Sequence, residues 1–135
     1  MKNVAVRDLI GIPYATHGRG RGGMDCYGVL IEFYRRAGLD FPDVFYCSTV
    51  EEGLASKISD TVKHGFDVER IDYPEYGCVV EISLHGESHA GVYLGGGSFI
   101  HATRNMGVCV QDIGRYSKCI KGFWRVIGYG DSQCV

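Results

Sequence analysis

The sequence has no long apolar stretch, which would indicate a membrane protein. It also has no long run of charge of one sign, which would indicate a nucleic-acid-binding protein. No apolar run approaches the roughly 20 residues that a helix needs to cross a bilayer. Charge of one sign never forms a long run, and the formal net charge is only -2. This balance argues against a nucleic-acid partner and against a polybasic surface that binds membranes. We therefore expect no nucleic-acid partner and no membrane span.

Residues 1–8 lack the apolar core of a secretory signal peptide. We therefore expect the protein to be made in the cytoplasm and to stay there unless another component carries it out. The six cysteines contain no C-x-x-C pair, so their spacing resembles neither a zinc ribbon nor a zinc finger. An even number of cysteines would allow three disulfides, but the missing signal peptide favours free thiols.

Proline is scarce, with three residues, whereas glycine is abundant, with 20. We expect the fold to be organised around residues 23–38, where a glycine-rich loop gives way to an amphipathic helix. From Tyr27 onward, apolar side chains recur at the spacing of one helix face, at Val29, Leu30, Phe33 and Ala37. Gly38 is expected to end this helix.

Cys26 lies where this loop enters the predicted helix. Unpaired backbone N–H groups and the positive end of the helix dipole favour a thiolate there, so we predict a pKa below that of a free thiol. A small buried cysteine is the simpler interpretation of a single Cys. The rest of the chain decides between the two.

Two further helices are predicted, over residues 4–10 and 48–63. After residue 65 the hydrophobic period changes to two, which predicts strands. The expected strands are 66–71, 77–83, 88–94, 98–103, 107–111 and 122–129, with a glycine turn at 95–97. Helices first and strands last predict a single α+β domain over residues 1–135, with an antiparallel sheet.

His89 and His101 lie on the two strands that flank the glycine turn, and both have odd numbers. If Leu94 pairs with Ser98, His101 faces Gly91 and His89 lies diagonally from it, roughly 7 Å away. A register one step tighter would place the two histidines directly opposite each other. Either register puts both imidazoles on one face of the sheet, close enough for one to orient the other.

Ordinary strand histidines are the alternative interpretation of either residue alone. No third ligand accompanies the pair, so the zinc signal is weak and we expect no metal and no cofactor. A cysteine at a helix N-terminus and a histidine pair on a sheet are together the components of a thiol hydrolase. The thiolate attacks a carbonyl, one histidine moves the proton, and the second group fixes the tautomer of the first.

Taken in order along the chain, these segments resemble the NlpC/P60 superfamily of papain-like cysteine peptidases, and most of all its short phage-tail branch. The matching segments are 10–14 for the G-x-P-Y approach, 24–30 for the D-C-x-G-L-v motif, 76–80 for G-D-v-v, 88–95 with 99–102 for the histidine hairpin, and 123–129 for the aromatic end. The resemblance implies a papain-like fold, with N-terminal helices on an antiparallel sheet and the nucleophile at a helix N-terminus.

By this resemblance Cys26 is the nucleophile, His89 the general base and His101 the third, orienting residue. Tyr14 matches a tyrosine that lines the site, and its phenol can donate to the developing oxyanion together with the Cys26 backbone N–H. Asp25 matches the acidic residue that, in the wall peptidases, helps hold the free amine of the substrate's L-Ala.

Two positions depart from the pattern. Tyr27 stands where wall hydrolases usually carry a serine that helps bind the substrate amine, although phage-tail members often have an aromatic residue there. We expect the Tyr27 side chain to project along the cleft beside the nucleophile and to change this subsite; the alternative is that it packs under the loop 18–23. Cys78 replaces the aspartate of G-D-v-v, which we expect to be a scaffold change.

The resemblance implies a cysteine endopeptidase that hydrolyses peptidoglycan stem peptides between the γ-D-glutamyl residue and the diamino acid. It also implies phage tail proteins as partners, with action in the periplasm or cell wall from a virion tail. Two alternatives stay open: an amidase or acyltransferase of the same fold, and a non-catalytic tail assembly protein. The intact set of Cys26, His89 and His101 argues against the non-catalytic one.

Overall fold

The computed structural model of the protein describes residues 3–41, 43, 66–84 and 86–129. The elements in chain order are η1 (Arg7–Leu9), β1 (Arg19–Gly20), β2 (Gly23–Met24), α1 (Cys26–Arg36), β3 (Phe66–Ile71), β4 (Val79–Leu84), β5 (Glu87–Gly95), β6 (Ser98–Thr103), β7 (Gly107–Asp112), η2 (Ile113–Tyr116) and β8 (Ile120–Tyr129), where η marks a short 3₁₀ helix. The helix predicted over 48–63 lies outside the described residues, as do Cys47 and Cys134. No helix in the described part of the chain is long and apolar enough to span a membrane.

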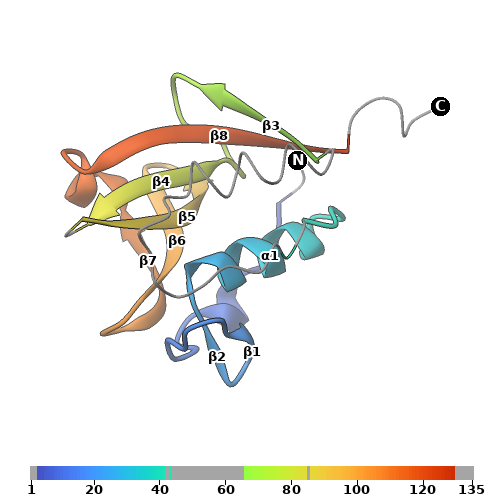
Figure 1. Ribbon diagram of the computed structural model, residues 1–135, viewed down its shortest axis with the longest axis vertical. Coiled ribbons are helices and arrows are strands. Elements are labelled where there is room, and N and C mark those ends of the chain that lie inside the picture. The colour runs from blue at the N-terminus through green and yellow to red at the C-terminus, as the bar shows by residue number, and fades with distance from the viewer. Residues whose placement is uncertain (1–2, 42, 44–65, 85, 130–135) are drawn as a thin grey trace.

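Within the described residues, six strands form one antiparallel sheet in the order β3-β8-β4-β5-β6-β7 (Figure 1). The last strand, β8, pairs with β3 on one side and with β4 on the other. Strands β4 to β7 follow one another as neighbours, as short turns between antiparallel strands require. The predicted α+β class with an antiparallel sheet is therefore confirmed. The single domain over residues 1–135 stays a prediction.

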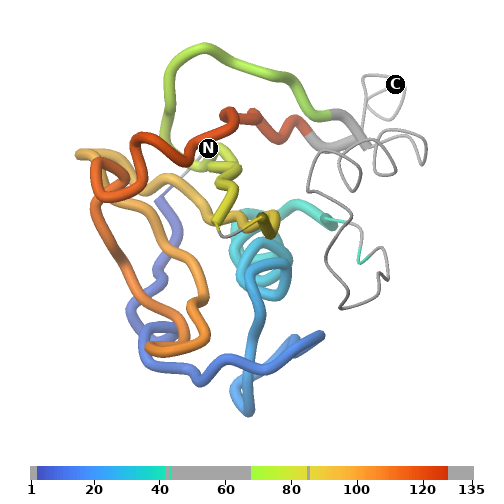
Figure 2. Tube along the Cα trace, turned by 60° about the vertical axis from the view of Figure 1, so that its left-hand side comes forward, coloured from blue at the N-terminus to red at the C-terminus, as the bar shows by residue number. Residues whose placement is uncertain are grey.

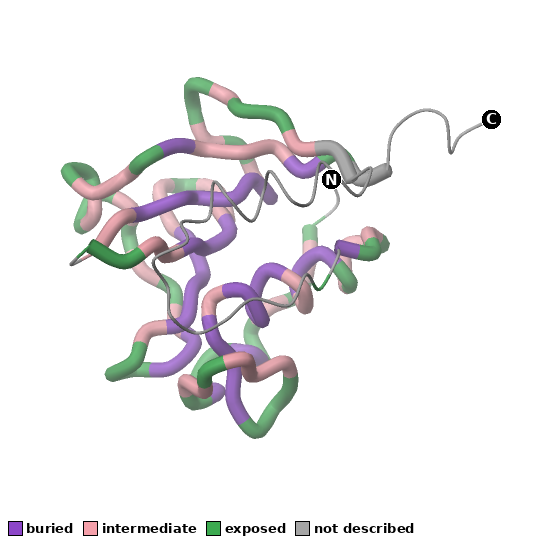
Figure 3. The backbone as a smooth tube through the Cα atoms, in the orientation of Figure 1, coloured by how far each residue is buried: buried purple, intermediate pink, exposed green. Residues whose placement is uncertain are grey.

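The helix α1 confirms the central helix of the sequence analysis. Its N-cap is Asp25, whose carboxylate accepts a hydrogen bond from the backbone N–H of Gly28. The predicted apolar face is buried, with Val29, Leu30 and Phe33 at most 1% exposed, and these side chains pack in one cluster with residues of the sheet. Figure 3 shows buried segments along α1 and along β4. At about 1.5–3 kcal/mol for each large side chain, this burial holds α1 on the sheet and fixes the position of its N-terminus.

The glycine-rich loop over residues 18–23, here called the approach loop, is more regular than predicted, because β1 and β2 form a two-stranded hairpin directly before α1 (Figure 1). Neighbouring atoms crowd Gly18, Gly23 and Gly28 so closely that a Cβ at any of them would overlap. The carbonyl group of Gly18 lies against Gly28 in the first turn of α1. These glycines therefore seat the loop on the helix close to Cys26.

The turn between β5 and β6 differs from the predicted one in its register. The expected pair of Leu94 with Ser98 is wrong, because a register shift pairs Ser98 with Gly95 instead. Gly95, Gly96 and Gly97 all have positive φ, a conformation that side chains disfavour. The three glycines thus absorb the irregularity, and the pairing beyond the turn keeps the register needed to align the two histidine strands.

Only residues 7–9 of the helix predicted over 4–10 are helical. The chain that follows runs beside β7 (Figure 2): Gly11 donates to the carbonyl of Val108, and Val108 donates to the carbonyl of Ile12. These bonds cover part of the edge of the sheet. They also lead the chain to Tyr14, which forms a parallel bridge with Met24 just before α1.

Candidate active site

Cys26 is the first residue of α1, so it occupies the predicted place at the helix N-terminus. The residue is partly exposed. Its thiol accepts a hydrogen bond from the backbone N–H of Ala90, which follows His89 in β5. Pairing of β5 with β6 begins at Gly91, so the Ala90 N–H lies just outside that ladder. The packing of α1 on the sheet therefore brings the sulfur to the strand that carries the predicted base.

The two predicted histidines meet directly. The Nε2 atom of His89 lies 2.7 Å from Nδ1 of His101, and the ring centroids are 4.9 Å apart. His101 is 0% exposed, and its Nε2 lies 2.7 Å from Oε1 of Gln111. The hydroxyl of Tyr116 donates to the same amide oxygen at 2.6 Å. The parity argument that paired the histidines is thus confirmed, and the hydrogen-bonded chain extends two residues further.

Sequence reasoning missed Gln111 and Tyr116. Gln111 could have been found, because it lies in a predicted strand at the same parity as Cys109, which pairs with His101 across β6 and β7. Side chains two residues apart on a strand share a face. Tyr116 carried no such signal, since it lies in η2, a short helix that no periodicity indicated.

Gly91 faces His101 across the β5–β6 pair, as the register analysis predicted. A Cβ at Gly91 would lie 2.6 Å from a ring carbon of Phe99 and 2.9 Å from the Cβ of His101. Both distances are shorter than the van der Waals contact distance between two carbon atoms. The missing side chain at Gly91 therefore lets β5 lie close to Phe99 and His101 of β6.

Burial raises the pKa of the Cys26 thiol to about 11, and the negative charge of Asp25 adds to the rise. The backbone N–H groups of Ala90 and Tyr27 and the guanidinium of Arg19 act in the opposite direction but do not outweigh these two causes. The prediction of a lowered pKa is therefore wrong for this arrangement. That prediction weighed the helix terminus and not the loss of water around the sulfur.

Both histidines are held neutral. Burial lowers the pKa of His89 to about 3, and the neighbouring His101 contributes to this shift. Burial also lowers the pKa of His101 to about 4, although the hydrogen bond to Gln111 acts against the shift. At neutral pH the site therefore contains a thiol and two uncharged imidazoles.

Tyr14 is partly buried beside this group. Burial raises the pKa of its phenol, and negative charge on Cys26 would raise it further, while Arg104 acts to lower it. The guanidinium of Arg104 lies 5.1 Å from the centroid of the Tyr14 ring, in a cation–π contact. The phenol therefore stays protonated at neutral pH, as a hydrogen-bond donor to an oxyanion must be. The oxyanion role itself stays a prediction.

Asp25 is 3% exposed and already has several partners within the protein. Its carboxylate accepts hydrogen bonds of 2.8 Å from the backbone N–H groups of Gly28 and His17, and it pairs with Arg19 at 2.9 Å. These contacts make Asp25 the cap of α1 and a link to the approach loop. Binding of a substrate amine by Asp25 stays a prediction, and the burial of its carboxylate does not favour it.

The place predicted for Tyr27, along the edge of the cleft, is wrong. The residue is 2% exposed, and its ring centroid lies 5.7 Å from that of Phe41. The guanidinium of Arg19, from the approach loop, lies 5.6 Å from the Tyr27 ring centroid. Tyr27 is therefore a core residue packed beneath the loop, which is the alternative that the sequence left open.

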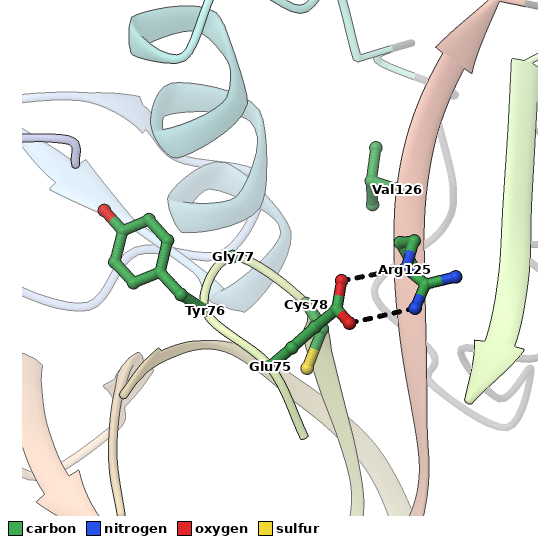
Figure 4. A pocket seen from close by; sticks show the side chains of 6 residues that line it. All are labelled: Glu75, Tyr76, Gly77, Cys78, Arg125 and Val126. Carbon is green, nitrogen blue, oxygen red and sulfur yellow. Dashed lines mark hydrogen bonds and ion pairs between the residues drawn. The ribbon is translucent and has the colours of Figure 1, made fainter. Parts of the chain in front are cut away.

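Cys78 lines a small pocket between the start of β4 and β8 (Figure 4). The residues around this pocket are Glu75, Tyr76, Gly77, Cys78, Arg125 and Val126. Arg125 donates to both carboxylate oxygens of Glu75, at 2.8 and 2.9 Å, and also to Glu69 at 2.6 Å. Cys78 is 1% exposed, in keeping with the scaffold role predicted for it. None of the predicted site residues lines this pocket.

The cysteines in the described part of the chain are free thiols, at Cys26, Cys78, Cys109 and Cys119. Within the same residues, no three side chains of His, Cys, Asp or Glu are grouped closely enough to hold a metal ion.

Comparison with known proteins bears on this arrangement of a helix-terminal cysteine beside a histidine hairpin. Residues 11–125 match the model of the NlpC/P60 family. The chain belongs to the NlpC/P60 family. The match includes the approach loop, α1 and both histidine strands, and it confirms the family resemblance drawn from the motifs. The family is one of hydrolases and peptidases. Membership of the phage-tail branch stays a prediction.

This NlpC/P60 chain is similar to much longer mycobacterial proteins. It is 28% identical over 94 residues to proteins of Mycobacterium tuberculosis and Mycobacterium bovis, each named a probable endopeptidase. The similarity covers 70% of this chain but only 20% of those proteins. The chain therefore spans about a fifth of the length of the curated relatives it matches.

Solved NlpC/P60 structures share the fold. The NlpC/P60 domain of the peptidoglycan hydrolase SagA aligns with a TM-score of 0.60 at 20% identity, covering 89% of this chain and 91% of that domain. The P60 domain of the antigen MAP1204 from Mycobacterium avium subspecies paratuberculosis gives 0.57 at 20% identity, covering 90% and 89%. At these identities the likeness establishes the fold and not the activity.

Proposed function

We propose that this NlpC/P60 domain is a cysteine endopeptidase in which Cys26 is the nucleophile, His89 the general base and His101 the orienting residue. The observation that carries the proposal is the joint placement of the three. The Cys26 thiol accepts a hydrogen bond from the backbone N–H of Ala90, the residue after His89. The Nε2 atom of His89 is hydrogen-bonded to Nδ1 of His101. The second ring nitrogen of His89, Nδ1, is then the one that serves the thiol.

The reaction proceeds in two steps. Nδ1 of His89 takes the thiol proton as sulfur bonds to the substrate carbonyl carbon, and the backbone N–H of Cys26 and the phenol of Tyr14 donate to the oxyanion. The C–N bond breaks, the leaving amine takes the proton from His89, and a thioester remains on Cys26. Water, deprotonated by His89, then hydrolyses the thioester and restores the thiol.

The proposed substrate is a peptidoglycan stem peptide, cleaved between the γ-D-glutamyl residue and the diamino acid. The family match supports a peptidase, and one structural neighbour is the domain of a peptidoglycan hydrolase. The finer choice of bond rests on the motifs at residues 24–30 and 88–102. The proposal includes action in the cell wall or periplasm after delivery by a phage tail, which the chain's likeness to short tail-associated members suggests.

Digestion of defined muropeptides, with the products weighed by mass spectrometry, tests this function. We expect the wild-type chain to release a fragment that ends in D-Glu, and Cys26→Ala to release none. Cleavage at the bond that joins the stem peptide to the sugar would identify an amidase instead. No cleavage of any muropeptide by folded wild-type protein would contradict the proposal and favour a non-catalytic tail component.

A further inference from the structure

We propose that Gln111, held by Tyr116, is a positioning residue that sets the tautomers of both site histidines and so leaves Nδ1 of His89 as the base. This inference rests on the proposed function of the same site. It adds two residues that act through the histidines and do not touch the substrate.

The tautomers follow from the hydrogen-bonded chain. The Oε1 atom of Gln111 can only accept, so the His101 nitrogen 2.7 Å away, Nε2, must carry a proton. In a neutral ring the other nitrogen, Nδ1, is then an acceptor. Nδ1 of His101 faces Nε2 of His89 at 2.7 Å, so His89 must carry its proton on Nε2. The Nδ1 atom of His89 is left unprotonated, as a base that takes the thiol proton requires.

The amide orientation of Gln111 controls this order. With the amide reversed, its NH₂ group would donate to Nε2 of His101, and every proton along the chain would move to the opposite nitrogen. Nδ1 of His89 would then carry a proton and could not act as the base. The hydroxyl oxygen of Tyr116 lies 2.6 Å from Oε1. This distance is usual for an O–H···O hydrogen bond and short for an N–H···O one, which favours the orientation with the amide oxygen toward both partners.

The aromatic rings packed around His101 hold this series of hydrogen-bonded side chains rigid. Tyr116 packs edge-on against both Phe99 and His101, with ring centroids 5.6 Å away in each case. The Phe99 ring lies 4.2 Å from the His101 ring. His101 is fully buried, so water does not replace a lost partner easily. The described titratable side chains that adjoin His101 are His89 from β5, Cys109 from β7 and Tyr116 from η2.

An amide suits this position better than a carboxylate. A negative charge beside His101 would stabilise its imidazolium form, in which Nδ1 also carries a proton. That proton would point at Nε2 of His89 and would force the proton of His89 onto Nδ1. The neutral oxygen of Gln111 orients His101 without charging it, so His89 keeps its basic nitrogen.

The most direct experiment is nuclear magnetic resonance of the full chain with ¹⁵N-labelled histidine at pH 7. The His89→Gln and His101→Gln variants assign the two rings among the five histidines. We expect a proton on Nε2 and none on Nδ1 in both rings. Protonation of Nδ1 in either ring of the wild type would overturn the proposal. This readout does not depend on substrate, so it tests the inference even if the proposed peptidase activity is not found.

Variants separate positioning from simple packing. Gln111→Leu removes the acceptor and should lower kcat about 10- to 100-fold with little change in KM. Gln111→Glu keeps the shape of the side chain and adds a negative charge. In this variant His101 should be doubly protonated at pH 7, and kcat should fall as much as in Gln111→Leu. Tyr116→Phe should lower kcat about fivefold, which corresponds to the loss of one neutral hydrogen bond.

The matched control is Tyr93→Phe, because the hydroxyl of Tyr93 bonds to the backbone of Gly97 and not to the histidine chain. This control should keep wild-type kcat and wild-type tautomers. A folded Gln111→Leu variant with wild-type kcat and unchanged tautomers would overturn the proposal. Full activity of Gln111→Glu would do so as well, even if the Leu variant does not fold.

Discussion

At the scale of single residues, burial opposes charge on each reacting group of the site. It raises the pKa of Cys26 to about 11 and lowers that of His89 to about 3, so neither group readily charges alone. A thiolate and an imidazolium that form together attract each other, which offsets part of the cost of burying both charges. When the sulfur attacks, its negative charge moves to the oxygen of the substrate carbonyl, so the site does not have to hold a buried thiolate. Proton transfer is therefore expected to accompany attack on the substrate rather than to precede it.

Asp25→Asn should lower the pKa of Cys26. The carboxylate raises that pKa through its negative charge, whereas Asn still caps the helix. The measurement is the pH dependence of iodoacetamide labelling at Cys26, followed by peptide mass spectrometry. The midpoint should lie above the ordinary value of about 8.5 in the wild type and lower in the variant.

The matched control for this experiment is Asp112→Asn, because Asp112 caps η2 in the same way. It should leave the labelling midpoint of Cys26 unchanged. A wild-type midpoint below the ordinary thiol value, or no shift in Asp25→Asn, would show that burial and Asp25 do not set the state of the thiol.

His89→Ala should lower kcat about 10³-fold or more, because it removes the proposed base. His101→Ala should cost only about 10- to 100-fold, since an orienting group moves no proton itself. His101→Asn should recover part of that loss, because its amide oxygen can accept from Nε2–H of His89. Steady-state kinetics on a stem peptide measures all three. Two alanine variants that are equally inactive while both remain folded would refute this division of roles.

Tyr27→Ser should lower the free energy of unfolding by about 3–5 kcal/mol, as for loss of a buried aromatic ring. Urea denaturation measures this change, with Tyr73→Ser as the control, since Tyr73 is 82% exposed. The preference between stem peptides with a free and an acetylated L-Ala amine should not change. A variant of normal stability with a changed preference would return Tyr27 to the substrate-binding site.

Sequence reasoning could place Cys26, His89 and His101 because each position follows from a local rule, a helix start or a strand parity. It could not place Tyr27, because the residues that cover its ring, Phe41 and Arg19, come from outside its own helix. The predicted direction of the Cys26 pKa shift was wrong for a related reason. Loss of water around a side chain is a property of packing, and no motif reports it.

At the scale of elements, Gly91→Ala tests the close approach of β5 to Phe99 and His101 of β6. The added Cβ would meet Phe99 and His101 at less than contact distance, so overpacking should cost about 1–3 kcal/mol of unfolding free energy. Displacement of the His101 ring should also lower kcat about tenfold. Thermal unfolding and kinetics measure the two effects.

The control for that substitution is Gly22→Ala, because a Cβ at Gly22 meets nothing within 4 Å. It should keep wild-type stability and activity. If Gly91→Ala behaves like the control, the glycine is not what makes room for His101.

Helix α1 and the strands from β3 onward could be predicted because each carries a clear hydrophobic period. The hairpin of β1 and β2 could not, since each strand has only two residues and glycine obscures any alternation. The register shift at Gly95 depends on the positive φ angles of the turn glycines, which the alternation of side chains does not report. The short η1 depends on a distant partner. In η1, the chain after Ile10 bonds to Val108 of β7 rather than continuing a helix.

At the scale of the whole molecule, the packing of α1 on the sheet brings the cysteine to β5, and β5, β6 and β7 align the two histidines with Gln111. No metal enters this account, so we expect EDTA to leave activity unchanged and metal analysis to find no stoichiometric zinc. Activity that disappears on dialysis against EDTA, together with one bound zinc per chain, would require a different mechanism.

In the proposed mechanism Cys26 forms a thioester with the substrate, and trapping that thioester is the sharpest test of the mechanism. Enzyme and stem peptide are mixed, quenched in acid within the first turnovers, and mapped by peptide mass spectrometry. We expect an L-Ala-D-Glu acyl group on Cys26 in the wild type and none in Cys26→Ala. An acyl group on another residue, or turnover that persists in Cys26→Ala, would contradict the mechanism.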